Sequence, residues 1–190
     1  MITIENDTST IHTVDQPRAF PLPGTMVYDL ISKPGFKQQI QPKIKLTNRV
    51  VVPLYETGLL PLLGMNKRIM LPTTKGRKTQ KMRAIPIGYF RIEEDIYVFS
   101  GWGKQANWYR NLMTYPEHVF LQIGFHRYQV HPEIVEEFQE IKRILTWLID
   151  HNPDDAKYLM GWDPQRDQLE TADFSLMIQK VLTVRFRLKK

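Results

Sequence analysis

Apolar residues recur at helical spacing in two segments of this chain. Residues 47–65 begin with a Thr-Asn pair, a plausible N-cap, and run apolar to Leu63; they predict a buried helix that Pro53 kinks. Residues 132–151 open with a proline and three glutamates, and apolar side chains follow three and four positions apart. Acidic residues in a first turn complement the helix dipole. The second segment therefore predicts a long helix, whose apolar face is a candidate partner surface.

Short apolar runs bounded by turn residues predict strands in the rest of the chain. These runs cover residues 68–74, 83–90, 96–100, 119–123, 126–130 and 181–189. The last run alternates apolar and polar side chains, which is typical of a half-buried strand. Because short turns join most neighbouring runs, we predict the α+β class, with mostly antiparallel strands and flanking helices. We expect the six strands to close into a small barrel.

The ends and the length of the chain predict one domain behind a short arm. Residues 1–24 show no period and end in a proline-rich turn, so we interpret them as an N-terminal arm. Residues 25–190 then form a single domain that includes both predicted helices. The first residues lack the basic start and the apolar stretch of a secretory signal, and the chain contains no cysteine. These features favour a cytoplasmic protein.

The longest apolar-rich stretch, inside residues 47–65, is shorter than the roughly 20 residues that span a bilayer, which leaves at most contact with a membrane surface. The formal charge is +6, and its distribution is uneven. Residues 66–131 carry eleven basic and four acidic side chains, whereas the segments on either side are nearly balanced. A local excess of this kind indicates an anion site rather than a surface coated for nucleic acid, and we expect no nucleic-acid partner.

Five basic residues fall within nine positions around one glycine, Gly76. They are Lys75, Arg77, Lys78, Lys81 and Arg83. A turn between two strands brings such side chains together, and a glycine lets backbone N–H groups approach a ligand closely. This basic turn is a candidate site for a phosphate or a carboxylate. The alternative interpretation is that these residues form a charged hairpin tip that contacts only solvent.

A glycine-bearing loop after the strand that ends at Ser100 is the second candidate. The loop reads Gly-Trp-Gly, and Asn107 caps the short helix that follows it. Helix N-termini and glycine loops offer unpaired N–H donors to an anion or to the polar edge of a ring. The alternative is that Trp102 and Trp108 are core or rim aromatics.

The sequence contains no recognisable metal or hydrolytic motif. Its five histidines show neither HxxxH nor HxH spacing, and it lacks GxSxG, P-loop and GxGxxG patterns. We therefore expect no metal and no side-chain nucleophile.

The basic turn and the glycine loop together form one pattern, LPTTKGRKTQKMRAIPIGYF followed by VFSGWGKQANWYRNLMTYPEHVFLQIG. This pattern resembles the deazaflavin-dependent nitroreductase family, which uses coenzyme F-420. Family members carry a Thr-Thr-x-Gly-Arg-Lys-Ser/Thr turn, then an arginine, a proline, a serine at the next strand end, and Trp-Tyr-x-Asn-Leu. The matching residues are Thr73, Thr74, Gly76, Arg77, Lys78, Thr79, Arg83, Pro86, Ser100, Trp108, Tyr109, Asn111 and Leu112.

The resemblance implies a split β-barrel with an FMN-binding-like fold and an oxidoreductase whose cofactor performs the hydride chemistry. The basic residues would hold the phosphate and the oligoglutamate tail of F-420, and the loop after Ser100 would lie along its ring. The implied cofactor-binding residues are Thr74, Lys75, Arg77, Lys78, Arg83, Pro86, Ser100, Gly101, Trp102, Gly103, Lys104 and Trp108. The implied acceptor is a small organic molecule, namely a quinone, an activated alkene or a nitro compound, with Tyr158 as the candidate proton donor. Related folds also form homodimers.

The chain departs from the family pattern in two places that bear on function. The turn has Gln80, Lys81 and Met82 at the positions where family members often have a glycine and a proline. The tyrosine-rich segment of the substrate pocket is not recognisable, and Tyr158 and Trp162 are its nearest counterparts. Two alternatives therefore stay open. One is the same fold with FMN as cofactor, and the other is a non-catalytic barrel for an anionic ligand such as haem or an oligonucleotide.

Overall fold

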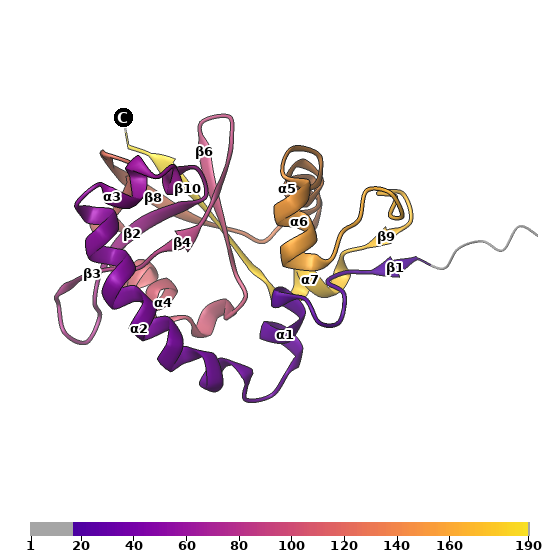
Figure 1. Ribbon diagram of the computed structural model, residues 1–190, viewed down its shortest axis with the longest axis horizontal. Coiled ribbons are helices and arrows are strands. Elements are labelled where there is room, and N and C mark those ends of the chain that lie inside the picture. Colours follow the sequence, from indigo (N-terminus) through magenta and orange to yellow (C-terminus); the bar gives the residue numbers. More distant parts are fainter. Residues whose placement is uncertain (1–16, 190) are drawn as a thin grey trace, which may run out of the picture.

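An eight-stranded antiparallel sheet forms a barrel in the computed structural model, which describes residues 17–189 (Figure 1). Its strands are β2 (Ile69–Lys75), β3 (Met82–Ala84), β4 (Ile87–Gly88), β5 (Phe90–Ile92), β6 (Asp95–Ser100), β7 (Val119–Ile123), β8 (His126–Val135) and β10 (Leu182–Leu188). Their order is β3-β2-β7-β8-β10-β6-β5, and β4 also pairs with β2. Because only Tyr89 separates β4 from β5, the chain passes directly from one edge of the sheet to the other and closes the barrel. The predicted α+β class and split β-barrel are confirmed.

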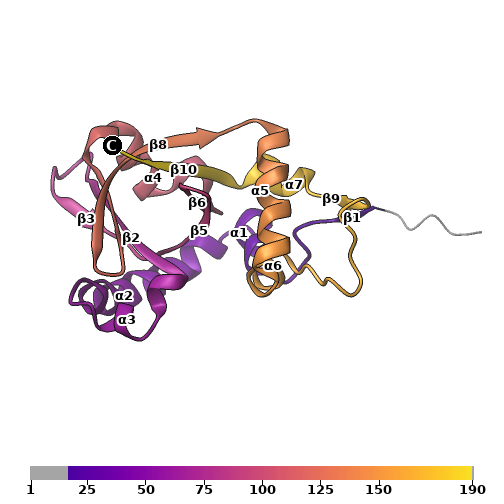
Figure 2. The ribbon, with the colours of Figure 1, turned by 90° about the horizontal axis from the view of Figure 1, so that it is seen from above.

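Helices flank the barrel on two sides (Figures 1 and 2). They are α1 (Met26–Ser32), α2 (Phe36–Glu56), α3 (Leu59–Leu62), α4 (Asn107–Thr114), α5 (Phe138–His151), α6 (Pro153–Met160) and α7 (Ser175–Lys180), with single turns of 3₁₀-helix at 65–67, 103–105 and 116–118. Helices α2 and α3 lie along one side, and α5 and α6 stand on the other side with α1 and α7 beneath them. No helix within residues 17–189 is both long enough and apolar enough to cross a membrane.

Two apolar cores hold these layers together. One fills the barrel with side chains such as Ile96, Leu121 and Phe186. The other lies between the barrel and the α5–α6 side, where the buried face of α5 (Ile141, Ile144, Leu145, Leu148 and Ile149) packs. Since the chain itself covers this apolar face, the predicted partner surface on the helix 132–151 is a core surface.

The predicted helix over 132–151 is wrong at its start, because residues 132–135 belong to β8 and α5 begins at Phe138. Pro132 pairs with Phe186 of β10 and lies beyond the part of β8 that pairs with β7. The missing N–H of the proline therefore removes no bond to β7. Glu133 is held in the strand by Arg185 of β10, at 2.7 Å, so a partner 52 residues away decides its conformation.

The predicted helix over 47–65 is also corrected. Helix α2 begins earlier, contains both Pro42 and Pro53, and ends at Glu56, and α3 is a separate four-residue helix. Gly58, at φ 85°, separates them. The segment is mostly exposed rather than buried: it meets the barrel through Tyr55, whose hydroxyl donates to the Ile69 carbonyl and accepts from the Gly124 N–H. Apolar side chains lie on every face of this stretch. Because only one face contacts the barrel, the apolar side chains on the other faces are exposed to solvent.

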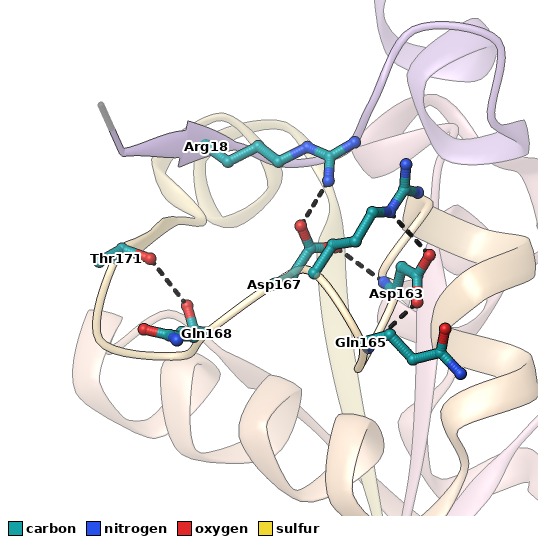
Figure 3. Close-up of polar contacts among 7 residues, drawn as sticks. Arg18, Asp163, Gln165, Asp167, Gln168 and Thr171 are labelled. Atoms are coloured by element: carbon teal, nitrogen blue, oxygen red, sulfur yellow. Dashed lines mark hydrogen bonds and ion pairs between the residues drawn. The ribbon is translucent and has the colours of Figure 1, made fainter. Parts of the chain in front are cut away.

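The predicted arm, residues 1–24, lies partly outside the described residues, which start at 17. Arg18 and Ala19 form β1, which pairs in parallel with β9 (Ala172–Asp173). The Arg18 guanidinium contacts Asp167 in the loop after α6, at 2.5 Å (Figure 3). Phe20 is fully buried against Trp162, with ring centroids 5.2 Å apart. The division of the chain at residue 24 stays a prediction.

Candidate functional site

The basic turn joins β2 to β3 at one end of the barrel. The Gly76 N–H donates to the Lys81 carbonyl at 2.9 Å, and the Gln80 N–H donates to the Gly76 carbonyl at 2.7 Å. A Cβ on residue 76 would lie 2.9 Å from Thr79 Oγ1 and 3.3 Å from Arg83 Nε. The turn therefore needs glycine at this position, because any side chain would displace the groups folded over it.

Helix α4 clamps this turn through two asparagines. Asn111 Oδ1 accepts from the backbone N–H of Arg77 at 3.2 Å and from its guanidinium at 3.3 Å. Asn107 Oδ1 accepts a further guanidinium bond at 3.3 Å. Asn111 is buried, at 6% exposed, so α4 fixes the position of Arg77 from within the fold. The two sequence candidates, the basic turn and the glycine loop with its helix, thus meet in space.

A pocket of about 310 Å³ opens between the turn and α4. Its lining residues are Gly76, Arg77, Lys78, Thr79, Arg83, Asn107 and Asn111. No carboxylate is among them, and within residues 17–189 none of the three cationic side chains forms an ion pair. Three positive charges without an acidic partner attract an anion. The pocket therefore fits a ligand that carries phosphate or carboxylate groups.

The loop after β6 continues from this pocket. Trp102 and Asn107 line a second pocket, of about 160 Å³, whose other wall comes from the first turns of α2. Asn107 lines both pockets. Ser100 is buried at the end of β6, and Gly101 packs against α1, where a Cβ would lie 2.7 Å from Leu30 Cδ1.

The chain matches the family model described as F420H(2)-dependent quinone reductase over residues 56–165, more than half of its length. The chain belongs to this family. It is an F-420-dependent oxidoreductase, with reduced coenzyme F-420 as its cofactor, and FMN is only an alternative. The matched segment contains the basic turn, the loop after β6 and α4, and it leaves out α2.

Solved structures of similar fold include an F420-H2 dependent reductase, FDR-A, at 19% identity over 64% of this chain and 95% of that one, with a TM-score of 0.43. A putative pyridoxamine 5'-phosphate oxidase from Listeria innocua shares 14% identity over 68% of this chain and 91% of that one, also at 0.43. The haem storage protein HutZ from Vibrio cholerae shares 13% identity over 68% and 89%, again at 0.43. No curated protein matches this chain. The family assignment rests on the family model, because similarities this distant do not bear on the chemistry.

Several residues predicted for the cofactor come together in this quinone reductase family member. Arg77, Lys78 and Arg83 line the first pocket, and Trp102 lines the second beside it. Lys75 points elsewhere, with its ammonium 4.9 Å from the ring centroid of Tyr115. Three further residues of the cofactor set line neither pocket: Thr74 is buried in β2 opposite Arg83, Pro86 is half-buried in the link between β3 and β4, and Trp108 is half-buried on α4.

Three predicted residues lie apart from the two pockets. Gly103 and Lys104 line a different hollow beside α5 and α7, where the Lys104 ammonium lies 3.4 Å from Glu136. Tyr158 is 67% exposed on α6, on the side of the molecule away from the basic turn (Figure 1). Sequence reasoning missed the α2 wall, since nothing in the sequence of α2 signals a ligand.

A larger hollow, about 490 Å³, lies at the other end of β2 beside Tyr89, Tyr128 and Trp147. Burial raises the pKa of Tyr89, whose hydroxyl donates to the Asn66 carbonyl at 2.7 Å. The individual residues that match the family motifs, from Thr73 to Leu112, are absent from the lining of this hollow, so the cofactor is not assigned to it. Within residues 17–189, no group of three or more His, Asp or Glu side chains is arranged to hold a metal ion.

Proposed function

We propose that the protein transfers a hydride from F-420 to a quinone, and that the pocket around Gly76 holds the anionic part of the cofactor. The observation that carries this proposal is the set of three unpaired cations, Arg77, Lys78 and Arg83, in one pocket without a carboxylate. The family description supports a quinone as acceptor, ahead of an activated alkene or a nitro compound. When bound, reduced F-420 supplies a hydride and a proton, and the quinone takes both to become a hydroquinone.

The protein contributes position and charge. A guanidinium has five N–H donors, and Arg77 directs two of its nitrogens to Asn107 and Asn111. Arg83 donates one guanidinium bond to Thr79 Oγ1 at 3.3 Å. The remaining donors of Arg77 and Arg83, with the ammonium of Lys78, can bind phosphate and carboxylate oxygens. Because Arg77 is held in place before the cofactor binds, less conformational freedom is lost on binding. Proton delivery by Tyr158 stays a prediction.

Titration of the purified protein with F-420, followed by fluorescence at low ionic strength, tests the anion pocket. Charge-assisted bonds contribute about 1.5–3 kcal/mol each, so Arg77→Ala and Arg83→Ala should each raise the Kd about 10- to 100-fold. Arg143→Ala, an exposed arginine on α5, is the matched control and should bind as wild type does. Wild-type affinity in both pocket variants would refute the assignment, and tighter binding of FMN than of F-420 would change the cofactor.

Turnover with a quinone, a nitroarene and an enone, each at equal concentration, tests the acceptor. We expect the highest kcat/KM with the quinone. If only the nitroarene or the enone were turned over, the quinone would be refuted as the acceptor, and the assignment of F-420 as cofactor would be unchanged.

Contact with a membrane surface, a homodimer and a cytoplasmic location stay predictions. Leu46, Val50, Leu62 and Leu63 are exposed on α2 and α3, with basic residues around them on α2, and this is the surface that a lipid headgroup layer or a second copy would cover. Flotation with phosphatidylserine-containing vesicles detects the first partner, and analytical ultracentrifugation detects the second.

A further inference from the structure

The pocket of about 160 Å³ between α2 and the loop after β6 has a wall that the family match does not cover. Lys37, Gln38 and Gln41 form this wall, and Trp102, Gln105 and Asn107 face it. The match begins at residue 56, after nearly all of α2. The side with Trp102 and Asn107 therefore belongs to the shared family segment, whereas the opposite wall comes from a helix outside it.

Helix geometry explains which glutamines face the pocket. Residues three or four positions apart share one face of a helix, and Lys37, Gln38 and Gln41 satisfy this spacing within the first two turns of α2. Gln39 lies two positions from Gln41, about 160° around the helix. Gln38 and Gln39 are both exposed, but only Gln38 lines the pocket. The chain thus offers a glutamine inside the pocket and an adjacent one outside it.

The chemistry of the lining differs from that of the first pocket. Its polar groups are four carboxamides and a single ammonium, with no carboxylate, and Trp102 supplies the aromatic surface. Carboxamide N–H₂ groups donate to carbonyl oxygens, and an indole offers a flat apolar face. This combination suits a flat, uncharged molecule that carries carbonyl groups, whereas an anion is better held by the three cations of the neighbouring pocket.

We propose that Gln38 and Gln41 are specificity-determining residues that bind a quinone acceptor, with Trp102 as the opposite wall. The proposal rests on the proposed function, because the acceptor must lie beside the cofactor, and the two pockets share Asn107 as a lining residue. It assigns one wall of the acceptor pocket to α2, outside the family segment, and the opposite wall to Trp102 within that segment.

Binding of menadione, a flat naphthoquinone without charge, tests the proposal in the absence of cofactor. Saturable quenching of tryptophan fluorescence should report the Kd, and Trp102→Phe should remove most of the signal. The double variant Gln38→Leu/Gln41→Leu removes two donors and should raise the Kd about tenfold. Gln39→Leu is the matched control and should leave it unchanged. Thermal unfolding measures whether each variant is still folded. Gln41→Glu is a second variant, which keeps the shape of the side chain and removes its N–H₂ donor.

The same variants are then assayed with F-420. We expect the KM for menadione to rise with its Kd, while the Kd for F-420 stays within twofold of wild type. A raised Kd for F-420 would mean that the glutamines hold the cofactor, which overturns the proposal. Unchanged Kd and KM for menadione would overturn it as well. If the wild type bound F-420 and reduced no quinone, the proposed function would fail, and the cofactor-free titration would still decide whether α2 binds quinones.

Discussion

The clamp between α4 and the basic turn makes a sharp prediction for Asn111→Leu. Leucine has nearly the shape of asparagine and fits a buried position, but it cannot accept the two bonds that Asn111 Oδ1 takes from Arg77, at 3.2 and 3.3 Å. A hydrogen bond of this kind contributes about 0.5–1.5 kcal/mol net, so the two together hold Arg77 with about 1–3 kcal/mol. The substitution keeps all three lining cations and removes the bonds by which Asn111 holds Arg77.

This loss should appear in both stability and affinity. An Arg77 side chain that is no longer anchored must be ordered when the cofactor binds, and about 1.4 kcal/mol corresponds to a tenfold change in affinity. We therefore expect Asn111→Leu to raise the Kd for F-420 about tenfold, less than Arg77→Ala does, together with a small loss of unfolding free energy.

Fluorescence titration and urea unfolding of the same preparations measure the two effects. Met113→Ala, at an exposed position on the same helix, controls for changes in α4 itself. If Asn111→Leu folded and bound F-420 within twofold of wild type while Arg77→Ala lost affinity, the position of Arg77 would not depend on α4, and the clamp would have no role in binding.

Three further predictions concern the turn and the scaffold. Gly76→Ala should weaken F-420 binding, by less than Arg83→Ala does and measured by the same titration, because its Cβ would displace Thr79 Oγ1 and crowd the Arg83 side chain. Arg185→Met should lower the unfolding free energy in urea by about 2–3 kcal/mol, since it removes the arginine from half-buried Glu140 and leaves half-buried Glu133 with Arg187 alone. Arg187→Met, at 52% exposed, should cost under about 1 kcal/mol. The hydroxyl and N–H of Ser175 hold the pKa of Asp173 below its ordinary value. The carboxylate therefore stabilises the fold above the ordinary aspartate pKa of about 3.9, and the stability difference between wild type and Asp173→Asn should shrink as the pH falls below it. A difference that persisted in acid would contradict this.

Local patterns predicted most of the barrel strands, because alternation and turn residues act over a few positions. The single strand predicted over 83–90 was wrong, because this run divides into β3, β4 and the start of β5, which gives eight strands rather than six. The run 119–123 matches β7, and the alternating run at the C-terminus matches β10. The prediction of a helix for residues 132–135 was wrong for a physical reason. A proline followed by glutamates is a good helix start, but Arg185 holds Glu133 in a strand. Such a partner is invisible in a short window. The prediction that helix 47–65 is buried was wrong because apolar composition does not reveal how much of a helix the rest of the fold covers.

For the site, the sequence predicted which residues gather but not what holds them. The five basic residues were grouped by their spacing, and the structure separates them, since Lys75 lies against Tyr115 while Arg77 and Arg83 line a pocket. Residues adjacent in the loop after β6 diverge in the same way: Trp102 faces α2, and Lys104 faces Glu136. Spacing along a loop carries no information about direction, which depends on what the loop packs against.

Asn107 shows how the site depends on contacts that no local motif contains. At the sequence level it is only the start of a short helix. In the fold, its side chain accepts a bond from Arg77 and borders the pocket walled by α2. Helix α4 thereby contacts the basic turn, with its three cations, and also borders the pocket that four carboxamides and the indole of Trp102 line. A hydride transfer needs its donor and its acceptor side by side, and this junction is where the charged end of one pocket adjoins the neutral wall of the other.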